Sequence, residues 1–227
     1  LARPEVAGVI VSHGTDTLEE TGWFLDLAID SQKPIVLIGA QRNASESDFD
    51  GPRNLLNAAR ICVSQEARGK GAMLALNGQI NAAREATKAH TSSVETFRSG
   101  DFGFLGVADQ DRVLFYRTPA RRQHVPLDAR KDAQGKPVPL PRVDVVAMYG
   151  GADGALVRAA VAAGAKGIVI QALGWGNMNV AMYEAVAATL KKGIPVVVST
   201  RAPTGRGLPA SGFPGGGQPP QDLGAGL

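Results

Sequence analysis

Cysteine and histidine are scarce in this sequence, which limits the kinds of site it can build. Cys62 is the single cysteine among 227 residues, so an internal disulfide and a cysteine-ligated metal cluster are both excluded. The three histidines lie far apart, at positions 13, 90 and 124, which does not favour a metal centre. Cys62 lies in a helical pattern between two apolar residues, and we expect it to be buried and inert.

Long apolar runs and clustered charges are lacking as well. No apolar segment reaches the roughly 18 residues of a transmembrane helix, and no basic-then-apolar signal segment opens the chain. The formal net charge is +3, and lysine and arginine never form a run of five. The basic stripe that nucleic acid or an anionic membrane surface needs is therefore missing. We predict neither nucleic acid nor membrane as a partner.

The sequence contains instead a repeated strand-then-helix pattern, and 44% of its residues are hydrophobic, enough for a packed core. Short, nearly all-apolar runs are typical of strands buried in a parallel sheet. We predict such strands at residues 8–12, 34–38, 70–76, 143–149, 167–170 and 195–199. Helical patterns follow four of them, at residues 17–29, 50–67, 155–163 and 180–192.

The first two helices carry start signals. Thr17 with Glu20 three residues on predicts a capping box. Asp50 predicts a cap for the second helix, and Pro52 suits its first turn.

The segments between these elements are less regular. Residues 79–84 either pair with the preceding strand or form a turn, and residues 85–99 read as a functional loop with short pieces of structure. Residues 103–107 and 113–116 are strand-like. The tail from residue 201 includes the stretch GFPGGGQPP, which has too much glycine and proline to specify a helix or a central strand.

The alternation of strands and helices predicts an α/β fold in two parts. Residues 118–142 are rich in proline and charge and have no periodicity, so we interpret them as a linker. A larger N-terminal parallel-sheet domain is predicted over residues 1–117, and a smaller C-terminal parallel α/β domain over residues 143–227.

The turn after the first strand is where we expect a ligand to bind. The run at residues 8–12 is predicted to be a central strand, and residues 13–16 follow at its carboxyl end, directly before a helix. Open α/β sheets bind their ligands at that edge. Thr15 and Asp16 place a hydroxyl and a carboxylate side by side there, a combination suited to chemistry when a cation is near.

Each candidate side chain also has a purely structural interpretation. Asp16 or Thr17 can simply cap the helix, and from the local pattern alone this interpretation has about the same weight as the catalytic one. His13 is more simply a strand-end histidine bonded to the backbone than a general base. Lys88 is either a solvated surface charge, as most lysines are, or a proton carrier held beside a carboxylate.

Six motifs, taken together and in order, resemble the bacterial-type L-asparaginase family. The resemblance extends over nearly the whole chain, and a set of six is far more specific than one alone. The motifs are SHGTDTLEET, IGAQR, DFDGPRNL, AREATKAHT, RTPAR and GWGNMN.

The resemblance implies hydrolysis of the asparagine side-chain amide to aspartate and ammonia, with no metal and no organic cofactor. Thr15, Asp16 and Lys88 match the family's second catalytic threonine, its aspartate and its lysine, a triad in which the lysine and the aspartate prepare the hydroxyl or a water molecule. Asp16 also matches the residue that holds the substrate's amino group, and the backbone around Gly14 and Ala40 matches the lining of the site.

The resemblance also bears on assembly and compartment. It implies a dimer of dimers, a homotetramer in which Asn177 of the second domain contributes to a neighbouring subunit's site. We expect a cytoplasmic protein, although the compartment stays open because a signal peptide would lie upstream of Leu1.

The sequence departs from the family pattern at both ends. The family's first strand, whose turn carries the primary threonine nucleophile, would precede Leu1, and the serine that binds the substrate carboxylate would lie there too. The family's last strand and helix would follow the GFPGGGQPP stretch. We therefore expect an internal piece of a longer protein, an N-terminal sheet with its first strand missing, and negligible turnover by these 227 residues alone.

Three functions fit this sequence. The first is an amidohydrolase acting on asparagine, with glutamine as an open alternative. The second is the amide-hydrolysing subunit of an amidotransferase. The third is a catalytically silent, amino-acid-binding module of the same fold.

Overall fold

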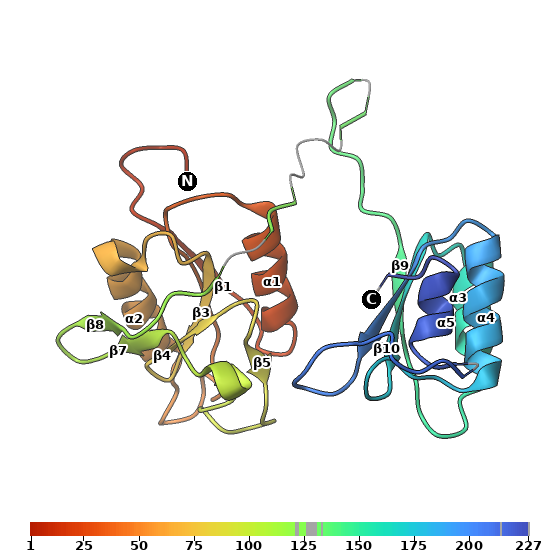
Figure 1. Ribbon diagram of the computed structural model, residues 1–227. Coiled ribbons are helices and arrows are strands. Elements are labelled where there is room, and N and C mark those ends of the chain that lie inside the picture. The colour runs from red at the N-terminus through yellow and green to blue at the C-terminus, as the bar shows by residue number, and fades with distance from the viewer. Residues whose placement is uncertain (121–122, 126–130, 133, 214, 227) are drawn as a thin grey trace. The chain divides into compact units, whose positions relative to one another are not determined.

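The protein is described by a computed structural model that covers residues 1–120, 123–125, 131–132, 134–213 and 215–226. Two compact units are present, residues 1–134 and residues 135–227 (Figure 1). Residues 121–122, 126–130 and 133, which belong to the predicted linker, lie outside the described residues. No helix in the described part of the chain combines the length and apolar character needed to cross a bilayer.

The N-terminal unit is built on a six-stranded sheet with the strand order β1-β2-β3-β4-β7-β8. The strands are β1 (Val9–Ser12), β2 (Ile35–Ile38), β3 (Ala72–Leu76), β4 (Gln79–Ala82), β7 (Gly106–Ala108) and β8 (Val113–Phe115). The helices are α1 (Leu18–Ala28) and α2 (Gly51–Val63), and 3₁₀ turns lie at Gln65–Ala67 and Gly100–Phe102.

This sheet is half parallel and half antiparallel. β1, β2 and β3 are parallel, as predicted, whereas β4, β7 and β8 run antiparallel to their neighbours. The switch occurs at Asn77 and Gly78, whose φ angles are +50° and +75°. Two successive positive φ angles form the tight turn that suits a two-residue hairpin. The α/β class is confirmed, and the sheet is mixed rather than parallel throughout.

β1 lies at the edge of this sheet rather than in its centre, where we predicted it. Its one partner among the described residues is β2. Three of its residues are only partly buried, and Ser12 is exposed. All four residues of β2, by contrast, are buried. A strand paired on one side leaves its other flank without neighbouring side chains, which accounts for the lower burial of β1.

The two helices cover opposite faces of the sheet (Figure 1). Ile35 and Leu37 of β2 belong to the same core cluster as Leu18 of α1. Val36, on the other face, belongs to the cluster that contains Cys62 of α2. Cys62 is buried as predicted, and burial raises the pKa of its thiol to about 11. Both faces of β2 are thus covered, as its continuous apolar run requires.

Neither helix start has the side-chain cap that the sequence predicts. Thr17 and Asp50 do occupy the cap positions, but neither side chain makes a capping hydrogen bond. The capping box predicted for α1 is therefore wrong. Asp50 fails as a cap because its carboxylate binds a neighbouring loop, as described below.

The segment at residues 85–99 forms a small hairpin outside the main sheet. Its strands are β5 (Thr87–Lys88) and β6 (Phe97–Arg98), which pair antiparallel with each other. Phe97 is buried in the core cluster beneath α1 and anchors β6. β5 carries the lysine that the sequence analysis singled out.

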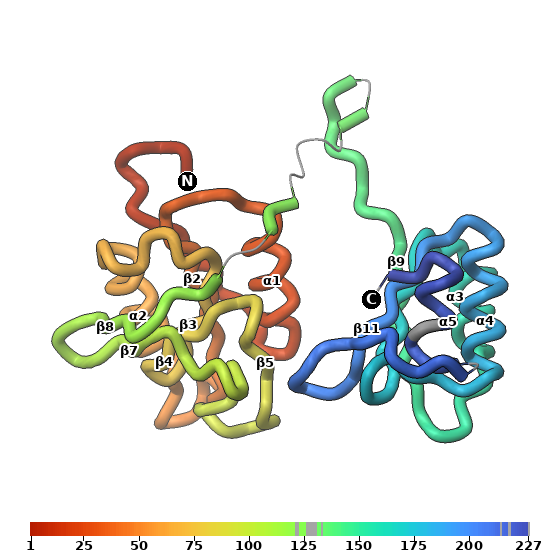
Figure 2. The backbone as a smooth tube through the Cα atoms, in the orientation of Figure 1, coloured from red at the N-terminus to blue at the C-terminus, as the bar shows by residue number. Residues whose placement is uncertain are grey.

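The C-terminal unit is a three-stranded parallel sheet with the order β11-β10-β9, as predicted. Its helices α3 and α4 lie on one side of the sheet (Figure 2), and Val157 and Met182 from them pack against the same core as Ile168. The tail, predicted to lack helices, contains the short helix α5. The bounds are β9 (Val143–Ala147), α3 (Ala155–Ala162), β10 (Gly167–Ala172), α4 (Val180–Lys191), β11 (Val196–Thr200) and α5 (Gln218–Asp222).

Candidate active site

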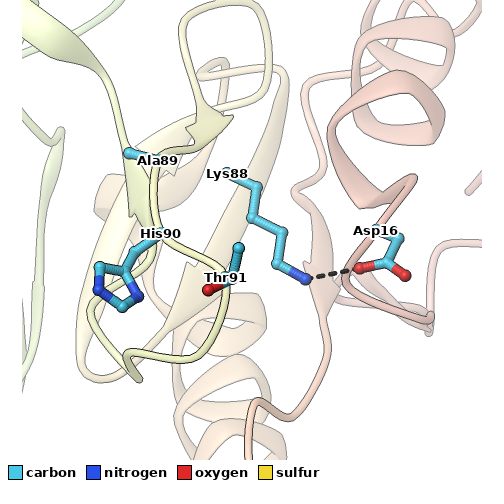
Figure 3. A pocket seen from close by; sticks show the side chains of 5 residues that line it. All are labelled: Asp16, Lys88, Ala89, His90 and Thr91. Carbon is cyan, nitrogen blue, oxygen red and sulfur yellow. Dashed lines mark hydrogen bonds and ion pairs between the residues drawn. The ribbon is translucent and has the colours of Figure 1, made fainter.

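Three predicted side chains meet at the carboxyl end of β1. Lys88 of β5 donates one hydrogen bond to Asp16 Oδ1, with Nζ at 2.6 Å, and another to Thr15 Oγ1 at 2.9 Å. Figure 3 shows the lysine side chain extending from the hairpin to the Asp16 carboxylate. The backbone fold brings them together, because Lys88 lies 72 residues beyond Asp16 in the sequence.

The ion pair is exposed on one side and sheltered on the other. The Lys88 side chain is 17% exposed, whereas the Asp16 side chain is 91% exposed. The hydrogen bond from Lys88, together with its positive charge, lowers the pKa of the Asp16 carboxyl below its ordinary range. Asp16 is therefore an ionised carboxylate at neutral pH and has free surface toward solvent.

An open pocket lies directly beside this pair. Its volume is about 270 Å³, and Asp16, Lys88, Ala89, His90 and Thr91 line it (Figure 3). A pocket of this size suits a small polar molecule such as an amino acid. It offers a carboxylate and an ammonium group to such a molecule.

The loop after β2 begins at the same edge of the sheet. Ser12 of β1 is in register with Ile38 of β2, so the residues that follow each strand are neighbours. Gly39 allows the two loops to approach closely, because a Cβ there would stand 2.8 Å from Thr15 Cγ2 and 2.9 Å from the His13 carbonyl oxygen. Ala40 follows Gly39 and is thereby placed beside the Thr15 turn.

Asp50 and Asn54 hold the loop that contains Ala40. The Asp50 carboxylate accepts hydrogen bonds from the backbone N–H groups of Gln41 and Arg42, at 3.2 and 3.0 Å. The buried Asn54 side chain donates to Asp50 Oδ2 and to the Gly39 carbonyl, each at 3.0 Å. Our reading of Asp50 as a helix cap missed this role, although the residues belong to the DFDGPRNL motif.

Gly14 leaves space at the turn itself. A Cβ added at Gly14 would meet no atom within 4 Å, so the backbone is approachable there. Small, exposed backbone of this kind is suited to close contact with a ligand.

Both histidines near the site are held by the backbone. His13 Nδ1 donates to the Gly14 carbonyl at 2.7 Å, and its Nε2 lies 3.0 Å from the Thr21 hydroxyl. The prediction that His13 is bonded to backbone is confirmed. His90 Nδ1 accepts the backbone N–H groups of Ser92 and Ser93. No group of three or more metal-binding side chains is present among the residues that the structure describes.

Asn177 belongs to the C-terminal unit, in the loop between β10 and α4. Its backbone N–H donates to the Leu173 carbonyl at 2.8 Å. Its side-chain oxygen is buried and accepts no hydrogen bond from the described residues.

Of the predicted site residues, the structure brings together Thr15, Asp16 and Lys88, with Gly14 and Ala40 beside them in the same unit.

Two family models match the two units of the chain. Residues 1–121 match the family described as Asparaginase, N-terminal, and residues 142–224 match the Glutaminase/Asparaginase C-terminal domain. The chain belongs to the asparaginase family. The proposed residues Thr15, Asp16 and Lys88 lie within the first match, and Asn177 lies within the second.

Individual asparaginases are similar along most of this chain. L-asparaginase 2 of Bacillus subtilis (strain 168) is 40% identical over 211 residues, which are 92% of this chain and 54% of that protein. A probable periplasmic L-asparaginase of Haemophilus influenzae is 37% identical over 200 residues, 87% of this chain and 56% of that protein. The chain thus spans little more than half the length of these relatives.

A solved structure shares the fold as well. The crystal structure of a probable cytoplasmic L-asparaginase from Campylobacter jejuni matches with a TM-score of 0.86 and 37% sequence identity. The match covers 97% of this chain and 68% of that one. The two-part α/β architecture is therefore that of an asparaginase.

Proposed function

We propose that this asparaginase-family chain supplies a site for the hydrolysis of L-asparagine to L-aspartate and ammonia. One observation carries the proposal: Lys88 Nζ lies within hydrogen-bond distance of both Asp16 Oδ1 and Thr15 Oγ1. A hydroxyl becomes a useful nucleophile or water activator when a base is within such reach.

The geometry supports a simple path for the proton. In its amine form, Lys88 accepts a proton from the Thr15 hydroxyl, or from a water molecule that the hydroxyl holds. The Asp16 carboxylate stabilises the ammonium that results. The activated oxygen attacks the amide carbon, and the Lys88 ammonium gives its proton to the amide nitrogen, so that the C–N bond breaks and ammonia leaves. Attack by water yields aspartate directly, whereas attack by the Thr15 oxygen leaves an ester, which a water molecule then hydrolyses to release aspartate and restore the hydroxyl.

The remaining predicted residues supply binding. The exposed face of the Asp16 carboxylate is suited to the substrate's α-ammonium group, and backbone near Gly14 and Ala40 is suited to its carboxylate and to the developing oxyanion. Asn177 is proposed to reach the site of a neighbouring copy in a dimer of dimers. The substrate is a small molecule, no cofactor takes part, and the proposed compartment is the cytoplasm, as in the name of the Campylobacter jejuni protein.

Ammonia release from asparagine tests the proposal. It is measured on the natural gene product that contains these 227 residues, beside the Lys88→Met variant. We expect release by the natural protein and none by the variant, with the far-UV circular dichroism of both unchanged. Lys192→Met, which removes an exposed lysine at the end of α4, is the matched control and keeps full release.

The same assay separates the alternative functions. Ammonia release from glutamine, supplied in place of asparagine, would show that the enzyme accepts both amides. The name of the matching C-terminal family includes glutaminase as well as asparaginase. The openness of the pocket and the exposure of Asp16 favour amino-acid binding without turnover as the second candidate. Calorimetric binding of aspartate without any ammonia release would support that binding module and overturn the hydrolase.

A further inference from the structure

Glu19 binds both residues of the strand that carries Lys88. It lies in the first turn of α1, three residues after Asp16. One carboxylate oxygen accepts a hydrogen bond from the Thr87 hydroxyl at 3.1 Å, and the other accepts one from the Lys88 backbone N–H at 2.5 Å. The contacts join segments that are 68 and 69 residues apart in the sequence.

Within the described part of the chain, the core residues that anchor this hairpin flank β5 and do not belong to it. Ala86, directly before β5, is buried in the same core cluster as Leu18 of α1. β5 contains two residues and pairs with β6 alone, outside the six-stranded sheet. Phe97 anchors β6 in the core, but it lies on the partner strand. A lysine side chain is flexible but limited in length, so its ammonium can contact Thr15 and Asp16 together only while its backbone lies within reach of both.

We infer that Glu19 is a positioning residue, which holds β5 against α1 so that Lys88 Nζ reaches Thr15 and Asp16. This inference rests on the proposed function only for the role of Lys88. The hydrogen bonds of Glu19 that fix β5 go to a hydroxyl and to a backbone N–H, whereas the ammonium donates to Thr15 and Asp16. Glu19 therefore fixes the position of the strand that carries Lys88, whereas Asp16 pairs with the Lys88 ammonium and stabilises its positive charge.

The Asp16 carboxyl provides a readout that does not depend on activity. Its pKa, measured by ¹³C NMR titration of the natural gene product, is lowered by the nearby Lys88 ammonium. Glu19→Ala is expected to raise this pKa by at least half of the rise that Lys88→Met produces. Loss of the Glu19 charge alone would change the Asp16 pKa in the opposite direction, because removing a nearby negative charge favours ionisation.

Two further variants separate hydrogen bonding from charge. Glu19→Gln keeps an oxygen that can accept from the Lys88 N–H and an amide group that can donate to the Thr87 hydroxyl, so it is expected to retain most of the wild-type shift. Glu20→Ala removes an exposed carboxylate from the same helix turn and is not expected to raise the pKa of Asp16. If Glu19→Ala does not fold, Thr87→Val carries the test, with an intermediate rise.

Several outcomes would overturn the inference. One is that the Asp16 pKa in Glu19→Ala equals that of the wild type. If Glu19→Ala does not fold, the same result in Thr87→Val overturns the inference. Another is a rise in Glu19→Gln as large as in Glu19→Ala, and a third is an unchanged Asp16 pKa in Lys88→Met.

Kinetics on the natural gene product complete the test. Glu19→Ala is expected to lower kcat at least tenfold with less than a threefold change in KM, since Glu19 is not among the residues that line the pocket. If Lys88→Met retains turnover, the proposed function fails, while the NMR result still decides whether Glu19 positions Lys88.

Discussion

The Lys88 ammonium and the Asp16 carboxylate meet at 2.6 Å across 72 residues of sequence. Solvent surrounds most of the Asp16 side chain, and exposed ion pairs contribute little to folding stability. Stability therefore does not account for the pair. Its place at the end of β1, beside the Thr15 hydroxyl and an open pocket, fits a role in chemistry.

Replacement of Asp16 by asparagine should separate function from stability. Asp16→Asn removes the charge that stabilises the Lys88 ammonium, so we expect ammonia release to be lost. The urea midpoint at pH 7 should stay close to that of the wild type. Because the Asp16 pKa is lowered by folding, the small contribution of the pair is present above pH about 4 and is lost as the pH falls below it. Asp101→Asn, an exposed aspartate of the same unit, serves as control. A large loss of stability in Asp16→Asn would contradict this account.

A methyl group at Gly39 should disturb the Thr15 turn. Gly39→Ala would place its Cβ 2.8 Å from Thr15 Cγ2 and 2.9 Å from the His13 carbonyl. Overpacking of this kind costs about 1–3 kcal/mol, and here it displaces the proposed nucleophile. We expect a lower free energy of unfolding and at least a tenfold loss of ammonia release. Gly150→Ala, whose Cβ would meet nothing within 4 Å, should change neither.

Loss of the Asn54 side chain should destabilise the N-terminal unit. Asn54 is 1% exposed, donates to the Gly39 carbonyl and accepts a hydrogen bond from the Asn77 N–H. Each buried group left without a partner in Asn54→Ala costs about 1–3 kcal/mol. Urea unfolding should therefore show a clear loss of stability. Asn43→Ala, at an exposed loop position, is expected to stay within about 0.5 kcal/mol of the wild type.

The Cys62 thiol should make stability fall in alkaline solution. Folding raises its pKa to about 11 from an ordinary value near 9.0, so the unfolded chain loses this proton first. The free energy of unfolding is thus expected to decline as the pH rises from about 9 to about 11. In Cys62→Ala, the free energy of unfolding should lack this part of the decline with pH. Urea unfolding at several pH values measures the decline in both proteins. Equal slopes in both proteins would show that the thiol does not titrate in this way.

The parallel part of the fold could be predicted from the sequence because burial on both faces leaves a continuous apolar run. β2 is such a run, and all of its residues are buried. In the other half, the strand-like segments were found, and residues 79–82 do pair with the preceding strand, but the antiparallel direction was not predicted. The signal for that direction is only two residues long, Asn77 and Gly78. The short helix α5 was missed because composition says nothing of the bond that joins Gly226 N–H to the Val196 carbonyl and ties the tail to the sheet.

Some residues of the candidate site could likewise be predicted from the sequence, and others could not. Thr15 and Asp16 could be found from local pattern, because they follow a strand and precede a helix. Lys88 was selected by family resemblance, since no local pattern distinguishes it from other lysines. Glu19 was not identified, and Asp50 was assigned as a helix cap, because their partners are distant or are backbone groups, which a sequence does not display.

The lysine belongs to one of the smallest ordered elements of its unit, a hairpin with two residues in each strand. Such an element can open locally while the six-stranded sheet stays intact. Mild denaturant would then detach the ammonium from its partners before any global transition occurs. Inactivation would precede unfolding, and it would reverse as soon as the denaturant is diluted.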